Sequence, residues 1–168
     1  MSLTPEALKK IDRELSKFPS DQRQSAVMAA LTIAQTEKGW LSNDTMQELA
    51  TYIGMPPIAV YEVASFFSMY NLKPTGKFKL TLCTNLPCQL QGAMQCAEHA
   101  KKTLGIGFGD TTADGMFTLK EGECFGACGD APVFTVNNHD IRAKITPDQF
   151  DDLTEELRRK AALDLKKA

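Results

Sequence analysis

The chain has 168 residues, of which 43% are hydrophobic and 24% are charged, so it can bury a core without covalent crosslinks. Its formal net charge of −2 gives no basic surface for nucleic acid, and no apolar run approaches the roughly 20 residues of a membrane helix. The start, "MSLTPEALKK", has no signal-peptide hydrophobic stretch, which predicts a reducing, cytosol-like compartment.

The first 72 residues predict a small bundle of short amphipathic helices with short connections. The expected helix starts are Thr4–Pro5, Ser20, Ser42 or Asn43, and Pro56–Pro57, and the expected ends are Pro19, Gly39 and Gly54. No catalytic cluster occurs in this part, so its expected role is packing or docking.

The stretch "NLKPTGK", residues 71–77, is the expected linker, which divides the chain into domains 1–72 and 73–168. After it, "KFKLTLC" alternates between apolar and polar residues, which predicts a half-buried strand. Phe78, Leu80 and Leu82 are expected on one face, and Lys77, Lys79 and Thr81 on the other. A helix is predicted to follow over residues 87–104, ended by Gly105.

The remaining elements complete a small α/β unit. "MFTLK", "PVFTV" and "IRAKI" read as strands, "NNHD" as the turn between the last two, and Thr146 to Gln149 as a capping box that starts a final helix. The expected apolar stripe of that helix is Phe150, Leu153 and Leu157. This order is compatible with a thioredoxin-like layout, in which Pro132 is a candidate cis proline.

All five cysteines lie beyond residue 82, and four of them form two close pairs. Cys83 and Cys88 are separated by four residues, and Cys124 and Cys128 by three. Both pairs fall where loops are expected, and loops at the same end of a sheet can bring four thiolates to one place. In a reducing compartment, clustered cysteines favour metal or redox chemistry over structural disulfides.

Three kinds of site compete for these cysteines. Structural zinc is typical of tighter spacings, and a redox C-x2-C motif is absent. A 2Fe–2S cluster needs four thiolates and tolerates the spacings observed, although they differ from the plant-type ferredoxin pattern. A Rieske centre needs two histidines with paired cysteines, and neither His99 nor His139 stands in such a motif. We expect His99 at the boundary of its helix, His139 in a turn, and Cys96 as a buried free thiol.

The glycines around the second pair explain the composition of "GECFGACGDAP". A cluster with four thiolates carries a formal charge of about −2, which needs hydrogen-bond donors near the sulfurs. Gly122, Gly126 and Gly129 would let backbone N–H groups approach without side-chain obstruction. The same glycines also suit tight turns, and the two roles are compatible.

Four segments together resemble a known family: "EVASFFSMYNLKP", "CTNLPCQLQGA", "TADGMFTL" and "ECFGACGDAP". The chain is similar to the small 2Fe–2S subunit of bacterial respiratory NADH:quinone oxidoreductase, complex I. The resemblance implies an α/β protein with an N-terminal helical bundle and a C-terminal thioredoxin-like 2Fe–2S ferredoxin domain. It also implies one 2Fe–2S cluster held by Cys83, Cys88, Cys124 and Cys128.

By the same resemblance, this chain has no active site of its own and serves as a subunit of the enzyme. Its partner is the larger subunit that binds FMN, NADH and a 4Fe–4S cluster, and the neighbouring large iron–sulfur subunit is a second expected contact. The assembly is expected on the cytoplasmic side of the inner membrane, peripheral to it, with no direct membrane insertion by this chain.

Alternative functions remain at this point. Related subunits serve NAD-linked hydrogenases and formate dehydrogenases. A free-standing thioredoxin-like ferredoxin is a further alternative, although a diffusing carrier does not need a docking bundle. A zinc-stabilised interaction module is the third.

Overall fold

The computed structural model describes residues 3–165, and the chain divides into two compact units, residues 1–74 and 75–168. The boundary lies within the linker expected at residues 71–77. Each unit encloses its own cluster of buried apolar side chains, and no residue belongs to both clusters.

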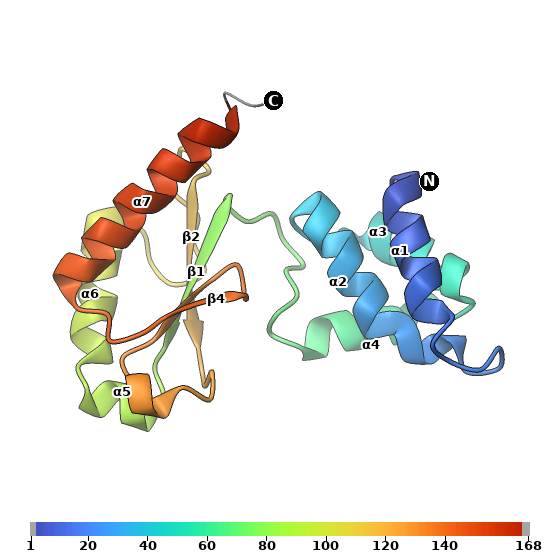
Figure 1. Cartoon of the computed structure of the whole chain (residues 1–168), viewed down its shortest axis with the longest axis horizontal. Helices are drawn as coiled ribbons and strands as arrows, with labels where there is room; N and C mark the ends of the chain where they lie inside the picture. The colour runs from blue at the N-terminus through green and yellow to red at the C-terminus, as the bar shows by residue number, and fades with distance from the viewer. Residues whose placement is uncertain (1–2, 166–168) are drawn as a thin grey trace. The chain divides into compact units, whose positions relative to one another are not determined.

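The described part of the first unit is a bundle of α-helices, as predicted (Figure 1). Its elements are α1 (Pro5–Leu15), the short 3-10 helix η1 (Arg23–Ala26), α2 (Val27–Lys38), α3 (Asn43–Ile53) and α4 (Pro57–Phe66). The largest fully buried side chains of this bundle are Ile11, Leu31, Leu41, Leu49 and Val60.

Most of the predicted helix ends are confirmed. Thr4 caps α1 and Ser42 caps α3, each through a side-chain oxygen that accepts a backbone N–H of the first turn. Gly39 and Gly54 end α2 and α3 with φ values of 81° and 84°, a left-handed conformation that glycine adopts without strain.

The prediction that Ser20 caps the second helix is wrong. Helix α1 already ends at Leu15, and α2 begins only at Val27, after η1. The Arg23 side chain donates to the backbone carbonyls of Tyr52 and Ile53, at 3.2 and 3.4 Å. These bonds connect η1 to the end of α3, a long-range contact that local sequence does not encode.

The second unit contains a mixed sheet with strand order β2-β1-β3-β4. The strands are β1 (Phe78–Cys83), β2 (Phe117–Gly122), β3 (Phe134–Val136) and β4 (Asp140–Arg142). Strand β1 pairs with β2 in parallel and with β3 antiparallel, and β3 pairs with β4 antiparallel. This arrangement agrees with the predicted α/β class.

The helices of the second unit are α5 (Leu86–Leu90), α6 (Ala93–Leu104) and α7 (Pro147–Leu165), with a 3-10 turn, η2 (Cys128–Asp130). Helices α6 and α7 lie side by side on one face of the sheet (Figure 1). The capping box of α7 is confirmed, because Thr146 N–H donates to Gln149 and Gln149 N–H donates back to Thr146. The predicted stripe of Phe150, Leu153 and Leu157 is buried.

Two predictions for this unit need correction. The helix expected over residues 87–104 is two helices, because Gly92 adopts a φ of 90° between α5 and α6. Strand β1 is not half-buried, since all six of its residues are buried, including Lys79 and Thr81. As an inner strand it has buried cross-strand neighbours, Thr118 and Thr135, on the face where polar exposure was expected.

Candidate metal centre

The first cysteine pair is positioned by the end of β1 and the start of α5. Cys83 is the last residue of β1, and Cys88 lies within α5. Asn85 caps α5 by accepting the N–H of Leu86 at 2.8 Å, so the chain turns sharply after the strand. Both thiols are buried. Because α5 is a single short turn, its dipole contributes less to this site than the long helix expected from the sequence.

The second pair lies on the loop that follows β2. Cys124 and Cys128 are both exposed, and Cys128 begins η2. Gly126, between them, has a φ of 69°, and its N–H donates to the Cys124 sulfur at 3.4 Å. Donation of a glycine N–H to a cysteine sulfur is the arrangement that the sequence predicted at this position.

The parallel pairing of β1 and β2 brings the two loops together. The carboxyl ends of parallel strands lie at the same edge of a sheet, and the register places Cys83 opposite Gly122, the last residue of β2. The Cys83 thiol donates to the Glu123 carbonyl at 3.3 Å, at the start of the second loop.

The pKa of Cys88 reflects its burial and its thiol neighbours. Burial is the largest of the causes that together raise the pKa of Cys88 to about 11, followed by the neighbouring Cys83 thiol, with a smaller contribution from Cys128. Anionic sulfurs therefore repel one another at this edge of the sheet, and a bound cation would relieve that repulsion.

The number and the type of the donors fit a 2Fe–2S cluster, which takes four cysteine thiolates. Within residues 3–165, no group of three or more histidine, cysteine, aspartate and glutamate side chains is arranged around a single metal position. Tetrahedral zinc needs four ligands converging on one ion, whereas a 2Fe–2S cluster takes its four cysteines as two per iron. The two cysteine pairs supply four thiols, the number that such a cluster needs.

The histidines and the fifth cysteine have other positions. His99 lies on α6 and pairs with Asp151 of α7 at 2.8 Å, consistent with the predicted boundary position. His139 occupies the turn between β3 and β4, as predicted. Cys96 is buried in α6, as expected, but its thiol also donates to the Ile145 carbonyl at 2.9 Å, a bond that the sequence did not indicate.

Gly122 has a packing role that sequence reasoning missed. A Cβ at this position would lie 2.6 Å from the Phe125 ring and 2.8 Å from the Thr81 methyl group. Phe125 therefore folds back over Gly122 and holds the start of the cysteine loop against β1. The Gly122 carbonyl accepts the N–H of Thr84 at 2.9 Å, which joins the two loops at their bases.

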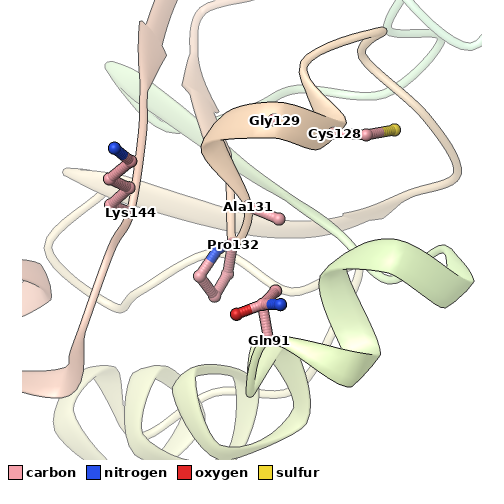
Figure 2. Close-up of a pocket in the computed structure, with 6 residues that line it drawn as sticks. All are labelled: Gln91, Cys128, Gly129, Ala131, Pro132 and Lys144. Carbon is pink, nitrogen blue, oxygen red and sulfur yellow. The ribbon is translucent and has the colours of Figure 1, made fainter.

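A hollow of about 400 Å³ lies beside the turn that carries Cys128. Gln91, Cys128, Gly129, Ala131, Pro132 and Lys144 line it, and Figure 2 shows the Cys128 sulfur directed away from Lys144. The Ala131–Pro132 peptide bond is cis, as the sequence suggested. Gln91 and Lys144 carried no sequence signal, because neither belongs to a motif.

Comparison with known proteins gives a family and a fold. Residues 11–158 match the family model described as thioredoxin-like [2Fe-2S] ferredoxin. The NADH-quinone oxidoreductase subunit 2 of Thermus thermophilus is 37% identical over 88% of this chain and 82% of its own length. A subunit of NADH-quinone oxidoreductase from Rhizobium meliloti is 40% identical over 88% of this chain and 86% of its own length.

A eukaryotic relative and two solved structures are also similar. The mitochondrial NADH dehydrogenase [ubiquinone] flavoprotein 2 of Dictyostelium discoideum is 40% identical over 90% of this chain, which spans 58% of that relative. Two crystal structures of NAD+-reducing [NiFe]-hydrogenase share the fold, with TM-scores of 0.66 and 0.72 at 20% and 22% identity. The matches cover 77% and 88% of this chain but only 22% and 25% of those chains. Among the described helices, none combines the length and apolar character needed to cross a membrane.

Proposed function

The chain belongs to the thioredoxin-like [2Fe-2S] ferredoxin family, and from this premise we propose that it is the 2Fe–2S electron-transfer subunit of an NADH-quinone oxidoreductase. Bacterial relatives with that enzyme name match most of this chain and most of their own length. The hydrogenase structures share the fold at lower identity, so they do not favour the hydrogenase alternative.

In this proposal the cluster ligands are Cys83, Cys88, Cys124 and Cys128. The observation that carries the assignment is the parallel register of β1 and β2, which sets Cys83 opposite Gly122 and so brings both cysteine loops to one sheet edge. The contribution of Cys83 and Cys128 to the pKa of Cys88 supports the same grouping.

The four proposed ligands form one buried pair and one exposed pair. When bound, a 2Fe–2S cluster supplies a one-electron carrier whose formal charge changes from about −2 to about −3 on reduction. Cys83 and Cys88 would hold its inner side among buried residues, while Cys124 and Cys128 lie at the surface. The Gly126 N–H stabilises negative charge on the Cys124 sulfur. The exposed pair therefore marks the side at which an electron partner approaches.

The partner that this role requires is a flavoprotein. We propose the subunit that binds FMN, NADH and a 4Fe–4S cluster as the direct partner, with the large iron–sulfur subunit as a second neighbour. This chain would then act within an assembly peripheral to the cytoplasmic face of the membrane. The helical bundle of residues 1–72 would dock onto these partners, and exposed apolar side chains on α4, such as Ile58 and Phe66, are available for such contact.

The first test is an absorption and EPR spectrum of the full chain, reconstituted anaerobically with iron and sulfide, before and after dithionite. We expect a red-brown protein with a near-axial or rhombic signal only in the reduced state. Substitution of serine for any one of the four proposed ligands should remove or alter this signal. Cys96→Ser is the matched control, because Cys96 is not a proposed ligand and serine can still donate to the Ile145 carbonyl, so the iron content should stay unchanged.

Other results would contradict the proposal. A colourless protein with stoichiometric zinc and no EPR signal would make the cysteines structural. Loss of iron in Cys96→Ser but not in Cys124→Ser would place the ligands elsewhere. Co-purification of the chain with a flavoprotein would separate the subunit role from that of a freely diffusing ferredoxin.

A further inference from the structure

A short segment between β4 and α7 fixes the backbone around the turn that contains Cys128. We call residues 144–145 the anchor segment. The Lys144 N–H donates to the Asp130 carbonyl at 2.8 Å, and the Ile145 N–H donates to the Pro132 carbonyl at 3.1 Å. Both acceptors lie within a few residues of Cys128, so the anchor segment sets where that turn lies.

The same backbone is connected to the first cysteine pair. The residue after Pro132 is Val133, whose carbonyl accepts the N–H of Cys83 at 3.0 Å. One run of backbone, residues 130–133, therefore bonds to the anchor segment on one side and to Cys83 on the other. Any displacement of the anchor segment would alter the spacing between the two cysteine pairs.

Helix α6 holds the anchor segment through Cys96. Its thiol is buried and donates to the Ile145 carbonyl at 2.9 Å. Burial raises the pKa of this thiol, which keeps it protonated and able to donate. An apolar side chain of similar volume would fill the same space but would leave this bond to the carbonyl unmade, at a cost in free energy.

We propose that Cys96 is a positioning residue for the cluster, acting through the hydrogen bond to Ile145 and the backbone bonds from the anchor segment to the Cys128 turn. The inference rests on the proposed ligand set and extends it, because Cys96 is not itself a ligand. Its thiol holds the Cys128 turn close to the sheet and limits the access of water to the site.

The test compares three variants of the full chain. Cys96→Val removes the donor at nearly constant volume, and Cys96→Ser retains a donor. Ala100→Gly is the packing control, since Ala100 is buried on the same helix and its methyl group makes no hydrogen bond. The readouts are amide hydrogen exchange at Lys144 and Ile145, the EPR g-values of the reduced protein, and the midpoint potential.

In Cys96→Val, we expect exchange at Lys144 and Ile145 to be roughly three- to tenfold faster, as loss of one net hydrogen bond allows. We also expect changed g-values and a higher midpoint potential, because water stabilises the more highly charged reduced cluster. In Cys96→Ser, the exchange rates, the g-values and the midpoint potential should return most of the way to the parent values. Ala100→Gly should change neither the g-values nor the potential.

The inference is overturned if Cys96→Val keeps the parent g-values and potential, or if Ala100→Gly reproduces the changes of Cys96→Val. Failure of the proposed function looks different, because the parent chain itself would then take up no cluster. In that case there is no cluster to position, and the proposed role of Cys96 fails together with the proposed function. Amide hydrogen exchange gives a separate test: an unchanged rate at Lys144 and Ile145 in cluster-free Cys96→Val would show that Cys96 does not hold the anchor segment.

Discussion

At the scale of single residues, Lys79 shows how burial changes the behaviour of a side chain. Its position on β1 follows the apolar–polar alternation that predicts exposure, yet it is buried. Burial, with a smaller contribution from the nearby Lys120, lowers the pKa of Lys79 to about 8. The folded state therefore disfavours the charged form of this lysine.

The prediction for Lys79 concerns the pH dependence of unfolding. The pKa of Lys79 is lower in the folded chain than in the unfolded chain, so the unfolded chain binds more protons between about pH 8 and 10.5. The unfolding free energy of the parent protein should increase as the pH rises through this range. Lys79→Met should be more stable than the parent at pH 7, and this difference in unfolding free energy should disappear at higher pH.

Urea unfolding of both proteins from pH 7 to 10 would measure this difference. Lys102→Met, at an exposed position on α6, is the control for loss of a positive charge. Parallel stability curves for the parent and Lys79→Met across the whole range would contradict the prediction.

At the scale of elements, the loop after β2 depends on contact with the strands beneath it. Phe125 and the Thr81 methyl group both lie close to Gly122, and the Thr81 hydroxyl is buried without a hydrogen-bond partner in the described structure. The loop is thus held by packing, by backbone bonds and by the Cys83 thiol at the end of β1, and the Thr81 hydroxyl makes no contribution. The chain has glycine at residue 122 because this contact leaves no room for a side chain.

Gly122→Ala should displace Phe125 and the start of the cysteine loop. The added methyl group would lie 2.6 Å from the ring and 2.8 Å from Thr81, and we expect a loss of roughly 1–3 kcal/mol in unfolding free energy, as for overpacking in a core. Chemical denaturation would measure the loss, and the iron content after reconstitution should also fall.

Gly129→Ala is the matched control for stability, because a Cβ there meets no atom within 4 Å. Equal unfolding free energies for the two variants would show that the contact between Phe125 and Gly122 does not hold the loop.

At the scale of the whole molecule, the chain has two independent cores. The buried cluster of the first unit runs from Leu3 to Tyr70, and that of the second from Phe78 to Ala161. All four proposed ligands lie in the second unit. We therefore expect the second unit to form the site without the bundle, whose docking role stays a prediction.

A fragment of residues 75–168 should fold and take up the cluster without the bundle. We expect a cooperative unfolding transition and the same reduced EPR signal as for the full chain, because the elements and the buried cluster that position the cysteine loops belong to this unit. The fragment carrying Cys128→Ser is the control for specific cluster binding. A fragment that stays unfolded after reconstitution would show that the bundle contributes to the stability of the second unit.

The sequence by itself determined features that depend on neighbouring residues: most of the helix caps, the α/β class, the turn between β3 and β4, and the two close pairs of cysteines. Capping, periodicity and the spacing of thiols act over a few residues, so they can be read along the chain. The four proposed ligands were identified by resemblance, which supplied their grouping but not their environment.

Only the tertiary structure decided which of the four paired cysteines are buried and what holds them. The register of β1 against β2, the return of Phe125 over Gly122, and the bond from Cys96 to Ile145 all join residues that local patterns do not connect. The burial of Lys79 has the same origin, since it follows from the inner position of β1 in the sheet. Such contacts are set by packing between elements, for which the local pattern of residue types carries no signal.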